Sequence, residues 1–474
     1  MPQPTTPLGF GVATASYQIE GSLDVGGRGR SNWDELCARP GAIVDGSDGP
    51  VACDSYRRLE EDLDLVVGLV GAGVYRFSIA WPRIQPDGRG PALVEGLDFY
   101  DRVVDGALAR GLAPMPTLYH WDLPQALEDD GGWPARDTAA RLADYAGLVA
   151  ARLGDRVTTW ATLNEPWCSA FLGYAAGVHA PGLRGGRRAF AAAHHLLLGH
   201  ALAAQAVRAT APGASVGIVL NLAPVRLDDD GDPAAATYVD AVQNGLWLDA
   251  LAAGTYPTVL EPLSDADLVR PGDLGLIEGS ADWVGLNYYT PYRVGALTAD
   301  SEAVGQDVDA YPGAPDFSFA PREPTTAMGW EVDATGLVDV LATLAEALPG
   351  LPIRITENGA AFDDDVLGAD GSVRDDDRIS YLREHIAAVD CSRAAGVPVV
   401  DYLAWTLLDN FEWAQGYTRT FGLVALEPGT LRRVPKASYA WFADLVRSRV
   451  ESAQHLSAVT SPEQDADVPA ADIG

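Results

Sequence analysis

Residues 157–167 read VTTWATLNEPW, a short β-rich run that ends in an asparagine, a glutamate and a proline. The preceding residues 138–153 are compatible with a helix, and Gly154 follows them as a normal helix stop. Strands that alternate with helices are typical of parallel β/α proteins. The stretch therefore predicts such an architecture, with polar residues gathered where the strand ends.

The same alternation continues along the chain. Residues 96–110, which Gly111 follows, are a second segment compatible with a helix. The β-rich runs lie near residues 8–14, 74–80, 113–119, 157–163, 215–221, 282–288, 353–356 and 399–405. Eight such units predict an α/β fold of the single (β/α)8 TIM barrel type. A doubly wound open sheet is the structural alternative.

No break in composition divides the chain before its last residues, so we expect residues 1–450 to form one (β/α)8 barrel domain. Residues 451–474 are polar and acidic and contain two prolines, which predicts a flexible acidic C-terminal tail. Residues 296–326 lack periodicity and contain four prolines. We expect a long surface loop there, of the kind that often contributes to function.

The charge balance limits the classes of partner. Acidic residues number 66 against 33 basic ones, which gives a net charge of −33 over 474 residues. Nucleic acids and anionic membranes attract basic patches, so neither is an expected partner. Hydrophobic residues make up 47%, enough for a large packed core and too many for a disordered chain. We interpret most of the acidity as surface charge that keeps the protein soluble.

Targeting signals and cofactor motifs are absent from the sequence pattern. Residues 1–6 lack the basic start of a signal peptide, and no run approaches the length of a membrane span, so we expect a cytoplasmic protein. The four cysteines form no C-x-x-C pair and are expected to be free thiols. His194, His195 and His200 share one helix, where we expect packing roles and no bound metal. No cofactor is expected.

Barrel enzymes build their sites at the C-terminal ends of the strands, so polar residues should gather there. Tryptophan, asparagine, histidine and carboxylate side chains do follow the β-rich runs in succession. In chain order they are Arg76, His120, Trp121, Asn164, Glu165, Trp167, Asn221, Asn287, Tyr289, Glu357, Trp405, Glu412 and Trp413. A succession of this kind is hard to explain as chance capping of strands.

These residue types suit a neutral sugar. Indole rings can cover its C–H bonds while polar groups bind its hydroxyls, and no Gly-rich phosphate loop precedes a helix. Glu165 and Glu357 follow the fourth and seventh strands, and closure of a barrel can bring them across one pocket. Glycoside hydrolysis requires such a carboxyl pair, with one acid/base and one nucleophile.

Several segments, in the right order, resemble the signatures of glycoside hydrolase family 1, the β-glucosidase family. TLNEP at 162–166 and ITENG at 355–359 resemble its two catalytic segments. Further similar segments are ATASYQIEG at 13–21, YRFSIAWPR at 75–83, HWDLP at 120–124 and DNFEW at 409–413. The resemblance extends from about residue 8 to residue 445.

The resemblance implies a retaining β-glucosidase that removes terminal non-reducing β-D-glucosyl residues from oligosaccharides or aryl and alkyl glucosides. Glu357 would be the nucleophile and Glu165 the acid/base, with carboxyl groups about 5–5.5 Å apart. Arg76 and Tyr289 would hold Glu357 ionised and oriented. The residues implied to bind the glucosyl unit are Gln18, His120, Trp121, Asn164, Tyr289, Trp405, Glu412 and Trp413. Those implied to face the leaving group are Trp167, Asn221 and Trp330.

The partners that the resemblance implies are small β-glucosides. The sequence does not decide between a monomer and a homo-oligomer. Glu412 implies an unphosphorylated sugar, because a carboxylate would repel a 6-phosphate. β-Galactosides and β-fucosides are alternatives within the class. A non-catalytic sugar-binding relative is disfavoured by the intact glutamate pair, and a nucleotide-dependent enzyme by the missing phosphate motif.

Two segments depart from the family pattern, and the role of one cysteine is open. The family usually has a basic residue where Thr420 stands, and Tyr-Val-Asp where residues 425–427 read ALE. We expect these departures to affect loop contacts and not the catalytic pair. Cys168, beside the TLNEP segment, either lines the leaving-group pocket or is a buried inert thiol.

Overall fold

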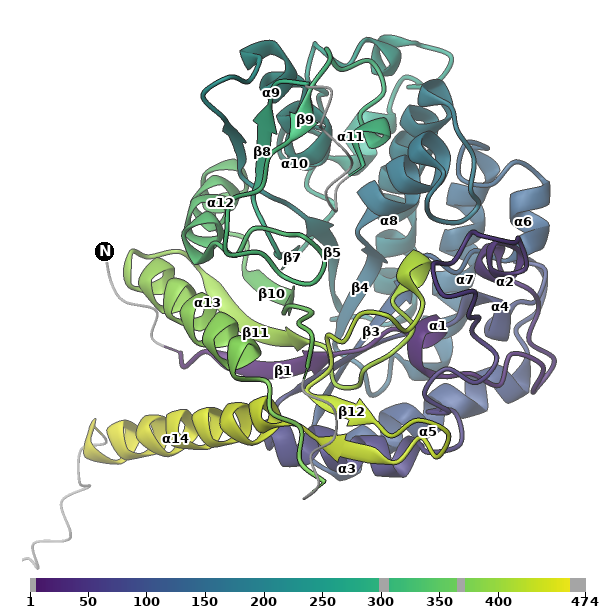
Figure 1. The fold of residues 1–474 in the computed structure, drawn as a ribbon. Helices are drawn as coiled ribbons and strands as arrows, with labels where there is room; N and C mark the ends of the chain where they lie inside the picture. Colours follow the sequence, from purple (N-terminus) through teal and green to yellow (C-terminus); the bar gives the residue numbers. More distant parts are fainter. Residues whose placement is uncertain (1–5, 298–306, 365–370, 461–474) are drawn as a thin grey trace, which may run out of the picture.

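The computed structural model describes residues 6–297, 307–364 and 371–460. Within these residues, parallel strands close into a central barrel that is surrounded by helices (Figure 1). The barrel strands are β1 (Gly9–Ala13), β2 (Val74–Ser78), β3 (Ala113–Tyr119), β4 (Thr159–Asn164), β5 (Ser215–Asn221), β7 (Trp283–Asn287), β10 (Ile353–Asn358) and β11 (Val399–Trp405). They neighbour one another in chain order, and β11 pairs with β1. The predicted (β/α)8 barrel is confirmed.

Helices cover the outside of the barrel and bury apolar side chains against it. The longer ones are α3 (Leu59–Val70), α5 (Val94–Ala109), α7 (Asp137–Leu153), α8 (Gly186–Thr210), α12 (Ala334–Ala347), α13 (Asp376–Ala394) and α14 (Ala437–Thr460). In α7, Leu142, Tyr145, Val149 and Leu153 are buried at helical spacing. The hydroxyl of Tyr145 donates to the carbonyl oxygens of Ile79 and Leu118, which fixes this helix against two strand ends.

Short elements occupy the connections between strands and helices. The short helices are α1 (Ser16–Ile19), α2 (Asn32–Cys37), α4 (Trp81–Ile84), α6 (Gln125–Asp129), η1 (Cys168–Ala176), α9 (Pro233–Asp240), η2 (Ala241–Gly245), α10 (Leu246–Ala253), η3 (Glu261–Ser264), α11 (Asp273–Ile277), η4 (Val308–Ala310) and η5 (Trp413–Gln415). The short strands are β6 (Val225–Leu227), β8 (Tyr292–Gly295), β9 (Ser318–Phe319), β12 (Val424–Leu426) and β13 (Arg433–Pro435). They form two small sheets outside the barrel, β6-β8-β9 and β12-β13.

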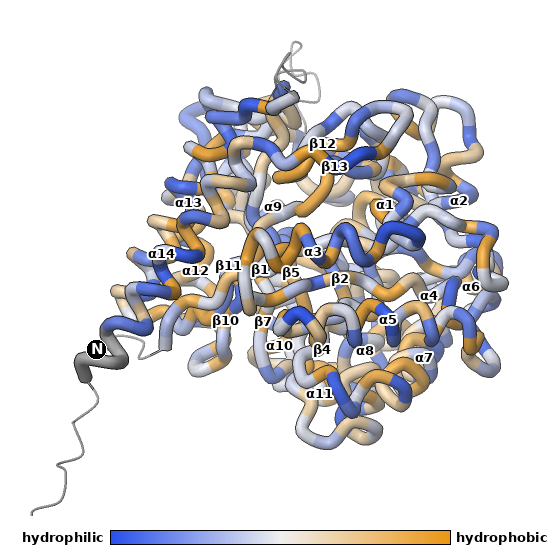
Figure 2. The backbone as a smooth tube through the Cα atoms, turned by 90° about the horizontal axis from the view of Figure 1, so that it is seen from below, coloured by the Kyte–Doolittle hydropathy of each residue, from blue (hydrophilic) through white to orange (hydrophobic). Residues whose placement is uncertain are grey.

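Apolar side chains fill two layers. Met115, Ala161, Val219 and Trp283 form a cluster contributed by β3, β4, β5 and β7. A much larger cluster lies between the strands and the helices, and Figure 2 shows hydrophobic stretches along the barrel strands with hydrophilic ones on the surrounding helices. Within the described residues, no helix has both the length and the apolar composition needed to cross a bilayer.

The flexible C-terminal tail expected from residue 451 stays a prediction, and the first ten residues of that stretch are helical. Helix α14 continues through residue 460, and residues 461–474 lie outside the described part of the chain. Polar composition does not oppose a helix, because Glu, Ala and Gln favour it and no Gly or Pro interrupts residues 451–461. The first residue able to stop the helix is Pro462.

Candidate active site

The two strands that carry the glutamates depart from regular pairing just before them. β4 shifts register against β5 between Ala161 and Asn164, and β10 shifts against β7 between Ile355 and Glu357. Glu165 itself has a left-handed backbone, with φ of 42°. Such irregularities at a barrel rim re-aim side chains, and here both carboxylates reach one pocket.

The signature ITENG ends in glycine for a steric reason. A Cβ on Gly359 would collide with the carbonyl oxygen of Trp405, where β10 and β11 lie side by side. Only glycine permits this approach, which holds the end of β11 against the segment that follows Glu357.

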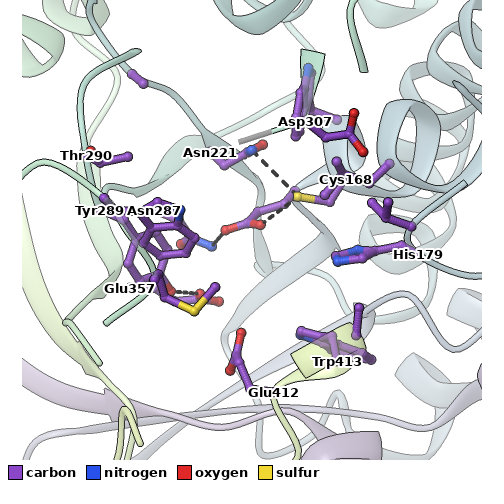
Figure 3. A pocket seen from close by; sticks show the side chains of 18 of the residues that line it. Cys168, His179, Asn221, Asn287, Tyr289, Thr290, Asp307, Glu357, Glu412 and Trp413 are labelled. Atoms are coloured by element: carbon purple, nitrogen blue, oxygen red, sulfur yellow. Dashed lines mark hydrogen bonds between the residues drawn. The ribbon is translucent and has the colours of Figure 1, made fainter. Parts of the chain in front are cut away.

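A cavity of about 400 Å³ opens at this end of the barrel (Figure 3). All but three of the side chains predicted for the site line it, namely His120, Trp121, Glu165, Trp167, Asn221, Tyr289, Trp330, Glu357, Trp405, Glu412 and Trp413. Gln18, Arg76 and Asn164 lie behind this wall, where they hydrogen-bond to residues that line it. The structure therefore gathers the predicted set, although its members come from distant parts of the chain.

Glu357 is held by a cation and a phenol. Arg76 Nη1 donates to its Oε1 at 2.6 Å, and the Tyr289 hydroxyl donates to its Oε2 at 2.6 Å. Arg76 is itself fixed by Thr117 Oγ1 at 3.1 Å and Asn164 Oδ1 at 2.7 Å. Burial raises the pKa of Glu357 above its usual value, and Arg76 and the hydrogen bond from Tyr289 offset part of that rise. Arg76 and Tyr289 thus favour the ionised carboxylate.

Glu165 has different surroundings, and among the described residues no cation hydrogen-bonds to it. Asn287 Nδ2 donates to its Oε1 at 2.6 Å, and Cys168 Sγ donates to its Oε2 at 3.1 Å. Burial and the negative charge of Glu357 raise the pKa of Glu165 to about 8. These surroundings favour a proton on Glu165 over one on Glu357.

Gln18 and Glu412 form a polar edge of the site. Gln18 Nε2 donates to the Phe411 carbonyl at 2.9 Å and to Glu412 Oε2 at 3.4 Å. Its Oε1 is buried without a hydrogen-bond partner among the described residues, which suits a ligand hydroxyl donor. Burial, followed by the charges of Glu357 and Glu165, raises the pKa of Glu412 to about 8.

Aromatic rings surround His120 in the pocket. The His120 ring stacks with Trp405 at 6.0 Å and with Trp413 at 5.9 Å between ring centroids. Its Nε2 lies 3.1 Å from Asn164 Nδ2, while its Nδ1 is buried and unpaired within the described residues. Burial lowers the pKa of His120, and Arg76 lowers it further, so the ring is neutral. This surface combines apolar faces with an open polar atom, as sugar recognition requires.

The outer part of the pocket is mainly aromatic. Trp167 contacts Tyr311 at 5.6 Å between ring centroids, and Trp330 contacts Tyr289 at 5.5 Å. Asn221 adds an amide to this wall. The three residues expected to face the leaving group thus line the same cavity as the two glutamates.

The predicted loop 296–326 contributes to this outer wall. Residues 298–306 lie outside the described residues, and the described remainder includes η4 and β9. Asp307, Tyr311 and Phe319 from this remainder line the pocket. The segment therefore shapes the opening of the site.

The contacts of two residues in the site were not predicted. Asn287, the last residue of β7, donates to Asn164 Oδ1 at 3.0 Å in addition to Glu165 and accepts from Thr356 Oγ1 at 2.7 Å. Its position at a strand end was the available signal, since that position marks most other residues of the site. The thiol of Cys168 faces Glu165, a contact for which the sequence offered no signal beyond proximity.

The three histidines of α8 are buried and bond to separate partners. His194 Nε2 lies 3.0 Å from Asp273, His195 Nδ1 3.0 Å from the Trp133 carbonyl, and His200 Nδ1 2.7 Å from Thr162 Oγ1. His194 thus has a carboxylate partner that sequence reasoning did not foresee. In the part of the chain that the structure describes, no three His, Cys, Asp or Glu side chains converge on a possible metal position.

The departures from the family pattern affect local contacts. Thr420 Oγ1 donates to the Phe362 carbonyl at 2.7 Å, and its own carbonyl accepts from Arg378. Glu427 pairs with Arg432 at 3.1 Å on the exposed hairpin between β12 and β13. Neither residue lines the pocket.

Nearly the whole chain is similar to known proteins. Residues 5–451 match the model of glycosyl hydrolase family 1. A β-glucosidase from Agrobacterium sp. is 46% identical over 441 residues, which cover 92% of this chain and 94% of that protein. A bifunctional β-D-glucosidase/β-D-fucosidase from Bifidobacterium breve is also 46% identical, over 91% of this chain and 96% of that protein.

Solved structures agree in fold. The family 1 β-glucosidase from Thermotoga maritima superposes with a TM-score of 0.86 at 39% identity, over 95% of this chain and 99% of that one. The same enzyme in complex with glucoimidazole gives a TM-score of 0.85 at 41% identity, over 94% and 99% of the two chains. This chain belongs to glycosyl hydrolase family 1.

Proposed function

We propose that this chain is a retaining β-glucosidase that hydrolyses terminal non-reducing β-D-glucosyl residues by double displacement. The observation that carries the proposal is the pair of buried glutamates in one pocket with opposite surroundings. Glu357 is held by Arg76 and Tyr289, and Glu165 has a raised pKa of about 8. This is the division between nucleophile and acid that the mechanism needs.

In the first step, a Glu357 carboxylate oxygen attacks the anomeric carbon of the glucosyl unit. The glycosidic bond breaks, and Glu165 gives its proton to the departing oxygen, so the leaving group departs as a neutral alcohol. The products are a glucosyl ester on Glu357 and an ionised Glu165. Asn287, which donates to Glu165 at 2.6 Å and whose hydrogen bonding lowers the pKa of Glu357, lies between the two carboxyls. It supports a short separation between them.

In the second step, water replaces the leaving group. Ionised Glu165 takes a proton from the water, whose oxygen attacks the anomeric carbon and releases Glu357 as a carboxylate. Two inversions leave the β configuration in the released glucose.

The pocket favours an unphosphorylated sugar. His120 Nδ1 and Glu412 offer polar atoms to hydroxyl groups beside the ring of Trp405. Gln18, whose Oε1 has no partner among the described residues, lies next to Glu412. The negative charge of Glu357 disfavours a 6-phosphate, and Glu412 and Glu165, whose pKa values are raised to about 8, add to this repulsion as the pH rises toward that value. β-Fucosides are a second candidate substrate class, because one relative at 46% identity is named as a β-D-glucosidase/β-D-fucosidase. The aromatic outer wall around Trp167 and Tyr311 suits aryl and alkyl leaving groups.

The proposal is tested with the wild-type protein and a panel of aryl β-glycosides. We expect hydrolysis of the glucoside, with the fucoside as the next best substrate and the glucoside 6-phosphate refused. NMR of the first-formed sugar should show the β anomer. An α anomer would overturn the double displacement, and hydrolysis of the 6-phosphate alone would overturn the substrate assignment.

The activity is expected to follow a bell-shaped pH profile. The first step needs protonated Glu165, so kcat/KM should fall as the pH rises through about 8, where its carboxyl loses the proton. It should also fall in acid, where Glu357 becomes protonated and loses its nucleophilic form. The measurement is kcat/KM against pH for an aryl glucoside. The alkaline fall should be weaker for a dinitrophenyl glucoside, whose leaving group needs little protonation, and an identical fall for both substrates would argue against Glu165 as the acid.

A further inference from the structure

The thiol of Cys168, which is labelled in Figure 3, lies against the carboxyl group of Glu165, and both residues line the pocket. We propose that Cys168 is a positioning residue for the acid/base glutamate: its S–H group holds one carboxyl oxygen in place and stabilises the carboxylate that remains after proton donation. This inference rests on the proposed function, because it concerns the acid/base role assigned there to Glu165.

The backbone brings the two side chains together. Glu165 has φ of 42°, and the amide of Cys168 donates to the carbonyl of Glu165 at 3.0 Å, which closes a tight turn around Pro166. Cys168 then begins η1, a π-helical segment. π-Helical turns often occur at functional sites because they redirect side chains that a regular helix would place elsewhere. Here the thiol is directed back to the carboxyl three residues earlier.

Hydrogen bonds hold both oxygens of the Glu165 carboxyl. Asn287 Nδ2 donates to Oε1 at 2.6 Å, and Cys168 Sγ donates to Oε2 at 3.1 Å. With one donor on each oxygen, the plane of the carboxyl group is fixed, and each oxygen keeps a further lone-pair direction for substrate or water. Proton transfer depends on such orientation, so loss of either donor should affect catalysis.

The thiol is itself supported from its other side. Asn221 Nδ2 donates to Cys168 Sγ at 3.7 Å, so the amide, the sulfur and the carboxyl form a chain of hydrogen bonds. A donor to the sulfur polarises the S–H bond and strengthens its donation to Glu165. Asn221, expected to face the leaving group, thus also has a partner within the site.

The sulfur stays protonated while Glu165 is ionised. Burial and the neighbouring carboxylate raise the pKa of the Cys168 thiol well above its usual value. A neutral thiol can donate to a carboxylate, whereas a thiolate would repel it. The other charged or titratable groups around Glu165 are Arg76, Glu357, Tyr289, Tyr292 and Glu412. All of these are retained when Cys168 is replaced, so the effect of the thiol can be measured separately.

The test is the alkaline limb of the kcat/KM profile in three variants. In Cys168→Ala and Cys168→Val the donor is lost, the ionised form of Glu165 is less stable, and the limb should move up by roughly half a pH unit. Cys168→Ser supplies a stronger donor and should move the limb down. Val fills the volume that Ala leaves empty, so agreement between Ala and Val separates the lost hydrogen bond from a packing defect.

The leaving group provides a second readout. Ala and Val should lower kcat/KM for an alkyl glucoside by about tenfold relative to a dinitrophenyl glucoside, because only the former depends on proton donation. Ser169→Ala, which alters a neighbouring buried residue of η1 that contacts Tyr119, is the matched control and should move neither quantity.

The outcomes are distinct. If the alkaline limb of kcat/KM does not move in the Ala, Val and Ser variants, and both leaving groups show equal losses, Cys168 does not have the proposed role. The proposed function would still stand in that case, provided that the wild-type protein has β-glucosidase activity. A wild-type protein without glycosidase activity would instead remove the proposed function itself. Movement of the Ser limb in the same direction as the Ala limb would also contradict donation by the thiol.

Discussion

Glu357→Gln is expected to reduce turnover of aryl β-glucosides by at least about 10⁴-fold, because an amide cannot act as the nucleophile. Gln has nearly the shape of Glu and can still accept from the Tyr289 hydroxyl, which lies 2.6 Å from the carboxylate in the native site. The pocket should therefore retain its geometry. The measurement is kcat with a dinitrophenyl glucoside, together with a circular dichroism spectrum that shows the fold.

The substitution also removes the anion from a buried pair with Arg76, whose Nη1 lies 2.6 Å from Glu357. Loss of such a partner can destabilise a protein by about 3–5 kcal/mol. Asp62→Asn is the matched control, because Asp62 forms a comparable buried pair with Arg433 at 2.8 Å and does not line the pocket. The control should lose stability and keep its turnover. Substantial hydrolysis by Glu357→Gln would contradict its role as the nucleophile.

Glu165→Ala is expected to have an effect that depends on the leaving group. For an alkyl glucoside, kcat/KM should fall by about 10²–10⁴-fold, since protonation of the departing oxygen is lost. A dinitrophenyl glucoside should form the glucosyl ester on Glu357 almost normally, but hydrolysis of the ester should slow without a base. The measurement is a series of glucosides with leaving groups of increasing acidity.

Azide distinguishes this role from a general loss of structure. It needs no base, so it should attack the glucosyl ester, restore turnover of the dinitrophenyl glucoside and yield β-glucosyl azide. Equal losses for all leaving groups, with no response to azide, would contradict the acid/base role of Glu165. The space left by the shortened side chain, next to Asn287 and Cys168, is where the azide would enter.

Local sequence signals predicted the elements well. The helix expected at 138–153 is α7 (Asp137–Leu153), and the run near 215–221 is β5 (Ser215–Asn221). These predictions agree with the structure because an apolar face and a glycine that ends a helix are both encoded by residues close together in the sequence. The stretch after residue 450 shows the limit of composition: polar residues indicate exposure, and an exposed segment can still be helical, as α14 is through residue 460.

Contacts within the site were less predictable. Cys168 is close to Glu165 in sequence, but its direction depends on a left-handed residue and a π-helical turn that no local pattern announced. Asn287 had the strand-end position of the other site residues, yet its shared contact with Asn164 and Glu165 depends on the register of the intervening strands.

The sequence by itself determined the alternation of strands and helices, the polar residues at the strand ends and the two glutamates among them. Only the tertiary structure decided how those glutamates differ. Closure of the barrel brings Arg76 to Glu357 across 281 positions and Gln18 to Phe411 across 393. The same closure buries Glu165 beside an anion and without a bonded cation, which raises its pKa to about 8. A pKa depends on every charge and solvent contact around a group, and these are set by folding and not by neighbours in the chain.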